Sequence, residues 1–270
     1  MRKKTIFALL CCLIAFSVYG PAWSQPKEEF KQKPIEKSAS YYLPSISEVY
    51  NSAQSFRITT NWAAKIKIKS VDYAKMPEVD RAFTVGKDLS DIAFLVLSKE
   101  EKEKPSANML EKADLAIVSL NPSAEIKKRL QNLKDGVRTG TLKGEQLRKE
   151  LDKVLNEVIP AIEKDPKLRD AGTLVWAAGF LRALYLGAST VAGFAEPTEE
   201  QLSMFRYGGT IGYFVEYFSE KAGDAFKTSA VVKNLLITLK KIQPILEKAP
   251  GKVTKQDLTD VAKELEAEFK

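Results

Sequence analysis

The stretch that decides the fold is Leu174–Ala195, LVWAAGFLRALYLGASTVAGFA, which carries a single charge, Arg182, in twenty-two residues. A run of about 20 apolar residues is long enough to cross a bilayer. A charge in the middle of such a span costs at least about 2.5 kcal/mol, and the small residues around Arg182 suit close helix contacts in a packed protein. We therefore expect residues 167–193 to form the central helix of a helical domain rather than a membrane span.

The remaining helices are predicted from apolar residues at i, i+3, i+4 and i+7 and from capping boxes at Ser45/Glu48, Thr198/Gln201 and Thr254/Asp257. The expected ranges are 45–56, 77–98, a helix from 106, 122–136 closed by Gly136, 141–158, 198–218 with an interruption at Gly208-Gly209, 229–248, and a surface helix from 254.

No convincing strand accompanies these helices. Residues 66–71, IKIKSV, alternate in polarity, but an isolated strand has nothing to pair with. The sequence therefore predicts an all-α fold of about eight to nine helices around the central apolar helix, arranged as a helical bundle or a TPR-like stack.

The N-terminal residues have the pattern of a secretory signal peptide. Basic residues 2–4 precede an apolar stretch too short to span a bilayer comfortably, and residues 22–24 are suited to signal peptidase cleavage. We expect residues 1–24 to be a cleaved signal peptide, 25–43 a flexible basic lead-in, and 44–270 a single all-helical domain. The predicted location is periplasmic or secreted, after cleavage near Ser24.

Missing residue types exclude several kinds of active site. Both cysteines, Cys11 and Cys12, lie in the predicted signal peptide, and the sequence has no histidine. A lipoprotein signal is an alternative, but the residues before Cys11 are not small. A Ser-His-Asp triad, a Cys-His pair and a zinc site of histidine or cysteine ligands are excluded from the mature chain. No EF-hand loop or nucleotide-binding motif is present, so we expect no enzyme, metal or cofactor.

The charge balance argues against a nucleic-acid partner. The formal net charge is +7, and it becomes +4 when the three basic residues of the signal peptide are removed. Lysines alternate with glutamates, as in EKEK, which is typical of solvated helix faces. No basic stripe with interleaved aromatic residues is present, so we expect no nucleic-acid binding.

Arg182 is the main candidate for a functional residue. A buried guanidinium is either paired with a carboxylate, such as Glu216 of the next apolar helix, or grips the anionic group of an otherwise apolar ligand. Aromatic residues cluster in the same two helices, as they do in a ligand cavity and also in a filled core. The predicted ligand-binding residues are Arg182, Trp176, Tyr185, Tyr207, Tyr213 and Glu216.

Three stretches, YYLPSISEVYNSA, AFTVGKDLSDIAFLVLSKEEKE and WAAGFLRALYLGASTVA, resemble a family of exported, all-helical bacterial proteins with no assigned activity. Their order and spacing cover most of the predicted mature chain. The resemblance implies an exported helical domain and assigns no catalytic residue. A more distant likeness, in architecture only, is to helical periplasmic components of lipid or sterol trafficking.

The leading functional hypothesis is a non-catalytic periplasmic protein that binds an apolar or amphiphilic small molecule, such as a lipid or sterol. The ligand would lie between the helices predicted at 167–193 and 199–218, with Arg182 or a tyrosine at its polar end. The alternative is a helical scaffold or adaptor that binds other envelope proteins through an exposed apolar groove.

Overall fold

The computed structural model describes residues 44, 46–67, 69–97, 107–142, 146, 147, 149, 150, 153, 168–249 and 251–269. They belong to one compact unit, Tyr41–Lys270. The described residues form helices and turns without a strand, which confirms the all-α class and the absence of a strand at IKIKSV wherever that stretch is described. The predicted signal peptide, the lead-in and most of the helix expected at 141–158 lie outside the described residues.

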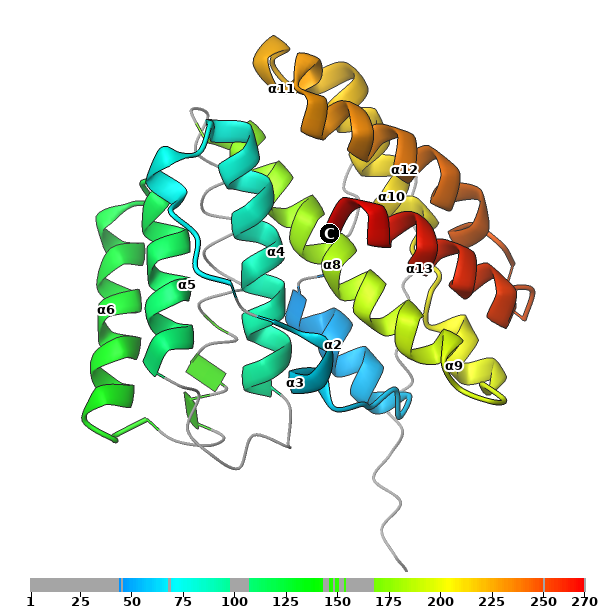
Figure 1. Cartoon of the computed structure of the whole chain (residues 1–270), viewed down its shortest axis with the longest axis horizontal. Helices are drawn as coiled ribbons and strands as arrows, with labels where there is room; N and C mark the ends of the chain where they lie inside the picture. The colour runs from blue at the N-terminus through cyan, green and yellow to red at the C-terminus, as the bar shows by residue number, and fades with distance from the viewer. Residues whose placement is uncertain are drawn as a thin grey trace, which may run out of the picture. The chain divides into compact units, whose positions relative to one another are not determined.

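The helices follow one another along the chain as shown in Figure 1. They are α2 (Ile46–Ser55), α3 (Trp62–Lys65), the 3-10 turn η1 (Tyr73–Lys75), α4 (Glu78–Leu97), α5 (Ala107–Ser119), α6 (Ala124–Arg138), α8 (Arg169–Ala192), α9 (Glu199–Ser203), α10 (Gly208–Glu216), the π-helical turn η2 (Tyr217–Lys221), α11 (Asp224–Thr228), α12 (Ala230–Leu246) and α13 (Lys255–Phe269).

Helix α8 is the predicted central helix. Among the described residues it is the one helix long and apolar enough to cross a membrane, yet 83% of its most apolar window is buried inside the protein. It packs against α2, α4 and α13, so its apolar surface is covered by other helices of the same chain. Burial on every side explains why its sequence lacks the polar face of an amphipathic helix.

Helices α4 and α8 run parallel and very close together. Gly86 of α4 lies against α8, where an added Cβ would overlap the carbonyl oxygen of Val175 and lie 2.9 Å from the Cβ of Ala178. Five residues further along α4, Asp91 contacts Arg182 of α8. Later residues of α4 therefore contact later residues of α8, as expected when the two helices run in the same direction. The small residues predicted to permit close approach therefore do so at this contact.

Helices α12 and α13 form an antiparallel pair. Lys241 of α12 forms an ion pair with Glu264 of α13, and Lys248 forms one with Asp257 at the other end. Asp257 and Thr254 make the predicted reciprocal cap through backbone–side-chain hydrogen bonds. Burial acts to raise the pKa of Asp257, but hydrogen bonds from Lys248 and Thr254 outweigh it, and the net pKa lies below the usual 3.8.

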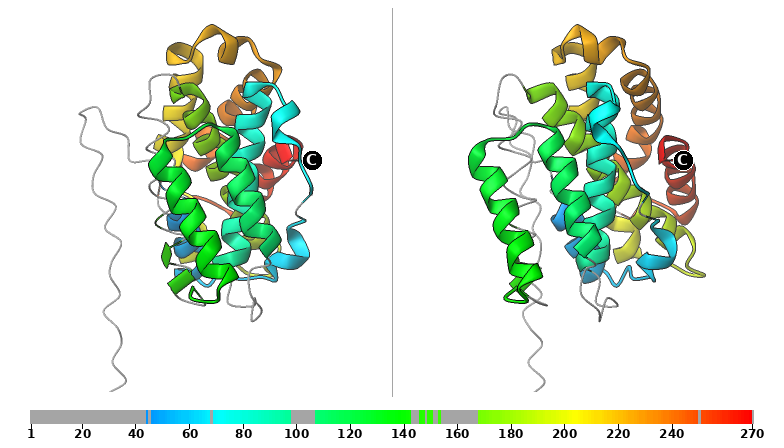
Figure 2. Two further views of the ribbon diagram at one scale, coloured as in Figure 1. Left: turned by 90° about the vertical axis from the view of Figure 1, so that its left-hand side faces the viewer. Right: turned by 60° about the vertical axis from the view of Figure 1, so that its left-hand side comes forward.

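On the other side of α4, helices α5 and α6 follow as neighbours, as Figure 2 shows. The sequence predicted that Gly136 ends α6, but the helix continues to Arg138 and the chain reverses at Gly140, whose φ is +73°. Gly136 instead permits close packing, because an added Cβ would lie 2.5 Å from Cδ1 of Leu142.

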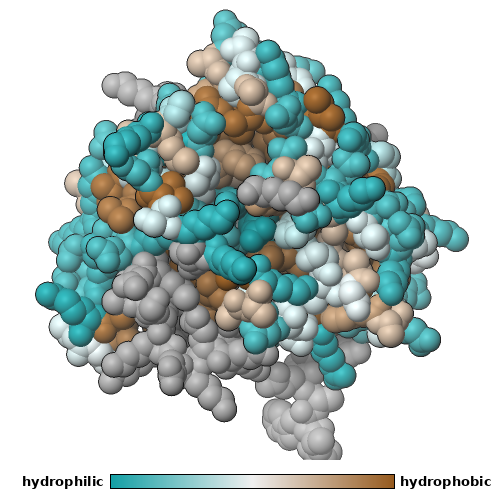
Figure 3. Space-filling view, viewed as in Figure 1, coloured by the Kyte–Doolittle hydropathy of each residue, from teal (hydrophilic) through white to brown (hydrophobic). Residues whose placement is uncertain are grey.

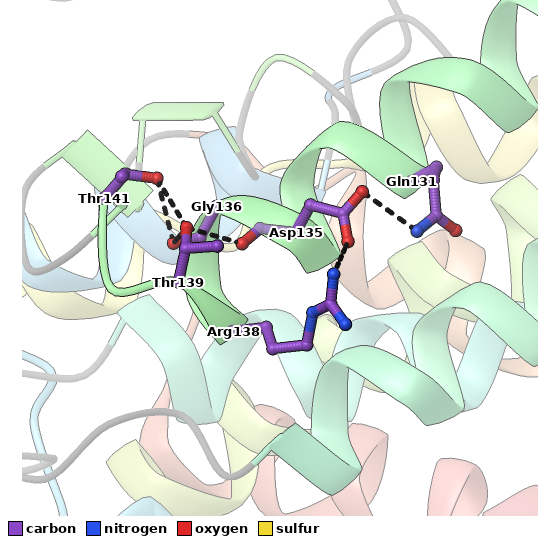
Figure 4. A network of polar contacts seen from close by, with 6 residues as sticks. All are labelled: Gln131, Asp135, Gly136, Arg138, Thr139 and Thr141. Atoms are coloured by element: carbon purple, nitrogen blue, oxygen red, sulfur yellow. Dashed lines mark hydrogen bonds and ion pairs between the residues drawn. The ribbon is translucent and has the colours of Figure 1, made fainter.

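Side chains close the end of α6 in the network drawn in Figure 4. The hydroxyl of Thr139 donates to the Asp135 carbonyl, and that of Thr141 donates to the Gly136 carbonyl. The Asp135 carboxylate accepts hydrogen bonds from Arg138 and Gln131. These contacts satisfy carbonyls that the helix end leaves without an intrahelical partner, so the network is structural.

The helix predicted at 198–218 is interrupted next to the predicted Gly208-Gly209 position, and the interruption is a full break between two helices. The capping box at Thr198 and Gln201 is present, but the helix ends at Ser203 and a new one begins at Gly208. Gly208 packs against Glu247 so closely that a Cβ would overlap its side chain, which fixes the break at the predicted Gly-Gly position. The short helices α3 and α11 and the two turns η1 and η2 were not predicted.

Candidate functional site

The charge in the middle of α8 is neutralised by a carboxylate of α4. Nε of Arg182 donates to Oδ1 of Asp91 at 2.6 Å, and Nη2 donates to Oδ2 at 3.3 Å. The two side chains are only 10% and 4% exposed. The predicted partner, Glu216, forms an ion pair with Lys221 instead. The pair between α4 and α8 arises because these helices run parallel, an arrangement that spacing along the sequence does not reveal.

Two aromatic rings lie beside the Arg182 guanidinium, and a third ring stacks on one of them. Its central carbon lies 5.2 Å from the centroid of the Tyr185 ring and 5.5 Å from that of Phe269, the last described residue of α13. Phe269 also stacks on Phe83 of α4, with ring centroids 5.9 Å apart. A cation over aromatic faces is stabilised by the ring quadrupoles, by about 2 kcal/mol when desolvated.

Arg182 keeps hydrogen-bonding capacity beyond Asp91. A guanidinium has five N–H donors, and the contacts of Arg182 with Asp91 use one on Nε and one on Nη2. Among the described residues, no other acceptor contacts Arg182. Its Nη1 atom has no partner there and is not fully buried, so solvent reaches it. The end of the guanidinium formed by Nη1 and Nη2 is therefore open to a further acceptor.

A second cation lies beside the pair. Lys87 is one helical turn from both Phe83 and Asp91 on α4, and its charge acts on the Asp91 carboxyl. Within the described part of the chain, Lys87 makes no ion pair or hydrogen bond and is half-buried. We call the group Phe83, Lys87, Arg182, Tyr185 and Phe269, which lies where α4, α8 and α13 meet, the Arg182 site.

A layer of buried charge extends from the Arg182 site towards α5. Asp88 accepts a hydrogen bond of 2.7 Å from the Tyr73 hydroxyl and forms a 3.1 Å ion pair with Lys112. Lys112 also donates to the carbonyl of Lys69, which ties the chain before η1 to α5. Burial, together with the hydrogen bond to Asp88, raises the pKa of Tyr73 far above its usual value, so its hydroxyl stays a donor.

The Asp91 carboxyl titrates under opposing influences. Burial raises its pKa, Arg182 lowers it, Asp88 raises it and Lys87 lowers it, with a net shift upward. When both carboxyl groups are ionised, the layer contains two negative groups, Asp88 and Asp91, and three positive groups, which are Lys87, Lys112 and Arg182. Two negative and three positive groups leave one positive charge in excess, which favours an anion as any further occupant.

The other predicted ligand-binding residues do not join Arg182. Trp176 lies six residues before it, which places the two side chains roughly 120° apart around α8. The Trp176 indole donates to the carbonyl of Pro44 at 3.1 Å. Tyr207 packs edge-on against Phe180 at 5.2 Å, and burial raises its pKa, with a contribution from Glu48.

Tyr213 and Glu216 lie on α10, Tyr213 in a row of aromatic rings and Glu216 in its ion pair with Lys221. Tyr213 contacts Phe214 at 5.6 Å and Tyr217 at 6.0 Å. Tyr217 in turn donates to Asp170 at 2.6 Å, and burial, then this hydrogen bond, raises its pKa to about 12. Of the six predicted residues, the structure thus brings only Arg182 and Tyr185 together.

The interface between α8 and α10, where the ligand was expected, is occupied by packed rings. Phe180, Phe205, Phe214 and Phe218 are fully buried. Phe180 and Phe214 are 6.0 Å apart, and Phe214 and Phe218 stack at 6.5 Å. The ring-to-ring contacts show that this part of the aromatic cluster is packed core.

Lys87, Phe83, Asp91 and Phe269 were missed by reasoning from the sequence. Phe83, Lys87 and Asp91 follow one another at intervals of four on α4, so they share one face of the helix. This spacing could have indicated a charged face from the sequence. Phe269 had none, because its role depends on α13 packing against α8.

No group of three or more acidic, cysteine or histidine residues that could hold a metal ion occurs within the described ranges. No family model, curated protein or solved structure matches this chain.

Proposed function

We propose that this protein is an exported, non-catalytic binding protein for an amphiphilic small molecule with an anionic head, held at the Arg182 site. The observation that carries the proposal is the nearly buried Arg182, which has donors left over after pairing with Asp91. The excess positive charge of Lys87 and the rings of Phe83, Tyr185 and Phe269 supply the charge and the apolar contacts that such a molecule needs.

An apolar surface beside the Arg182 site could contact the apolar part of the ligand. Apolar side chains gather between α4 and the first part of α12, above the end of α13, in the view of Figure 3. These two helices contact each other, and Phe83 of α4 is a half-buried residue at the boundary with Phe269. An alkyl chain that leaves the Arg182 site along α4 would cover this surface.

The proposed architecture is a bundle around α8 rather than a TPR-like stack. Its support is that α2, α4 and α13, distant in sequence, all pack on α8, whereas a stack of hairpins relies on neighbours along the chain. The proposed export rests on the signal-peptide pattern of residues 1–24, and membership of the family of exported helical proteins rests on the quoted stretches.

Native mass spectrometry of the protein purified without detergent after export tests the proposal. We expect an added lipid-sized mass on the wild-type protein and on the control Lys128→Met, an exposed lysine of α6, and a markedly smaller bound fraction in Lys87→Met. Ligand at 100 times its dissociation constant adds about 2.7 kcal/mol of stability, which raises Tm by about 5–10 °C in a domain of this size. A bare wild-type protein whose Tm does not respond to dodecanoate or lysophospholipid refutes the proposal.

One observation favours the adaptor alternative. Leu115 and Val118, three residues apart on α5, are 54% and 40% exposed. If the protein is an adaptor that binds through α5, changing both residues to serine should abolish its complex with an envelope protein in native gels. Lipid binding at the Arg182 site should stay at the wild-type level in the same variant.

A further inference from the structure

The open end of Arg182 identifies the kind of head group that fits. Asp91 occupies the side of the guanidinium formed by Nε and Nη2, with contacts of 2.6 and 3.3 Å. The two terminal nitrogens, Nη1 and Nη2, form a second fork with two N–H bonds that point the same way. A planar carboxylate matches such a fork with two parallel hydrogen bonds, so one guanidinium can bind two carboxylates in its plane.

The charge layer sets the charge of the head group. Asp88 and Asp91 stand against Lys87, Lys112 and Arg182, so the layer lacks one negative charge. A single carboxylate supplies it. A phosphate monoester, whose second pKa is about 6, is close to doubly charged above neutral pH and would leave one uncompensated negative charge in a largely buried place.

The surroundings of the open end require an apolar body on the ligand. Tyr185 and Phe269 lie within 5.2 and 5.5 Å of the guanidinium carbon, and Phe83 stacks on Phe269. A small hydrophilic carboxylate would remove water from Nη1 and Nη2 of Arg182 but would leave the aromatic rings uncovered. A carboxylate at the end of an alkyl chain does both.

We infer that the Arg182 site selects a long-chain monocarboxylate, whose head binds Nη1 and Nη2 of Arg182 beside the Lys87 ammonium and whose chain leaves over Phe83 and Phe269. This inference rests on the proposed function and narrows it to one head group. Arg182 is shared between an internal carboxylate, which holds it in place, and the carboxylate of the ligand.

Calorimetric titration with three twelve-carbon probes below their aggregation concentrations tests the selectivity. Dodecanoate, dodecyl phosphate and dodecanol share a chain and differ in the head. At pH 7.5 we expect dodecanoate to bind at least about tenfold more tightly than either of the others. Equal affinity for dodecanoate and dodecyl phosphate, or tighter binding of the phosphate, overturns the carboxylate inference and leaves the proposed function standing. Binding of none of the three overturns both.

Two conservative variants test the geometry. Arg182→Lys keeps the charge opposite Asp91 but loses the second fork, and Lys87→Met keeps the apolar stem but loses the charge. Each should weaken dodecanoate binding about tenfold and leave dodecanol binding within a factor of about two. The matched control Arg138→Lys changes an arginine on α6 that is 79% exposed and should alter neither. Equal dodecanoate affinity in wild-type protein and Arg182→Lys, with both folded by circular dichroism, overturns the inference.

Discussion

Arg182→Met tests the buried ion pair that fixes α4 against α8. The pair is 2.6 Å long with side chains 10% and 4% exposed, and methionine keeps the apolar stem while removing the charge. Removing one partner of a buried pair costs about 3–5 kcal/mol, because the other charge is left buried and unpaired. Lys87 lies near enough to act on Asp91, so we expect the lower end, about 3 kcal/mol.

Urea denaturation followed by circular dichroism measures this loss. A change of 1 kcal/mol shifts Tm by about 2–4 °C in a chain of this size, so the expected 3 kcal/mol corresponds to about 6–12 °C. The control is Arg138→Met, which removes an exposed pair with Asp135 and should cost less than about 1 kcal/mol.

The loss in Arg182→Met should depend on pH with a definite sign. Burial raises the pKa of Asp91, and removing Arg182 removes the main influence that lowers it. The folded state then binds more protons than the unfolded state between the unfolded pKa, 3.8, and the raised folded value, so stability falls as pH rises through that window. We therefore expect a smaller difference between variant and wild type at pH 5 than at pH 7.

The double variant Asp91→Leu with Arg182→Met completes the cycle. Replacing a whole buried pair by apolar residues is often nearly neutral, so we expect the double variant to be more stable than Arg182→Met alone. A cost below about 1 kcal/mol for Arg182→Met at pH 7, or additive costs in the double variant, would refute the assignment of a coupled, buried pair.

Three further predictions concern packing and charge elsewhere. Gly86→Ala should lower the free energy of unfolding by more than about 2 kcal/mol, and Tm with it, because its Cβ would overlap the Val175 carbonyl. The control is Gly212→Ala, where the nearest neighbour is the flexible end of a glutamine at 3.3 Å. Equal Tm values for the two variants would contradict the close contact at Gly86. Ser90→Ala should be neutral or stabilising by up to about 1 kcal/mol in urea denaturation, because the fully buried hydroxyl has no partner among the described residues, and a loss of stability would show that the hydroxyl is bonded. Asp257→Asn should destabilise the protein at pH 7. The lowered folded pKa of Asp257 contributes stability that is complete above the unfolded value of 3.8 and is lost as pH falls through the folded pKa, so the difference should shrink below about pH 3.8; a difference that persists in full at pH 2 contradicts this.

The helical class and the central helix could be predicted because their signals are local. The length of the apolar run, its small residues and its one charge are all contained in Leu174–Ala195, and the structure places these residues in and just after the buried helix α8. The capping boxes at Thr198 and Thr254 are likewise local, because a cap involves residues three apart.

The position of the site could not be predicted from such signals. Whether Arg182 meets Asp91 or Glu216 depends on which helix packs on that face of α8, and both carboxylates lie on neighbouring apolar helices. The aromatic residues of α10 could not decide between a filled core and a cavity, because both need the same residue types; the structure shows packed rings there. Phe269 reaches Arg182 only because α13 folds back along α8.

The most direct test of the central claim is the nuclear magnetic resonance spectrum of the arginine side chains in ¹⁵N-labelled protein, with and without dodecanoate. The Arg182 signals are assigned by their absence in Arg182→Lys. We predict that the Nη signals of Arg182 shift and sharpen with dodecanoate and do not respond to dodecanol, while those of the exposed Arg138 stay in place. Unchanged Arg182 signals at dodecanoate concentrations that saturate binding would contradict the account.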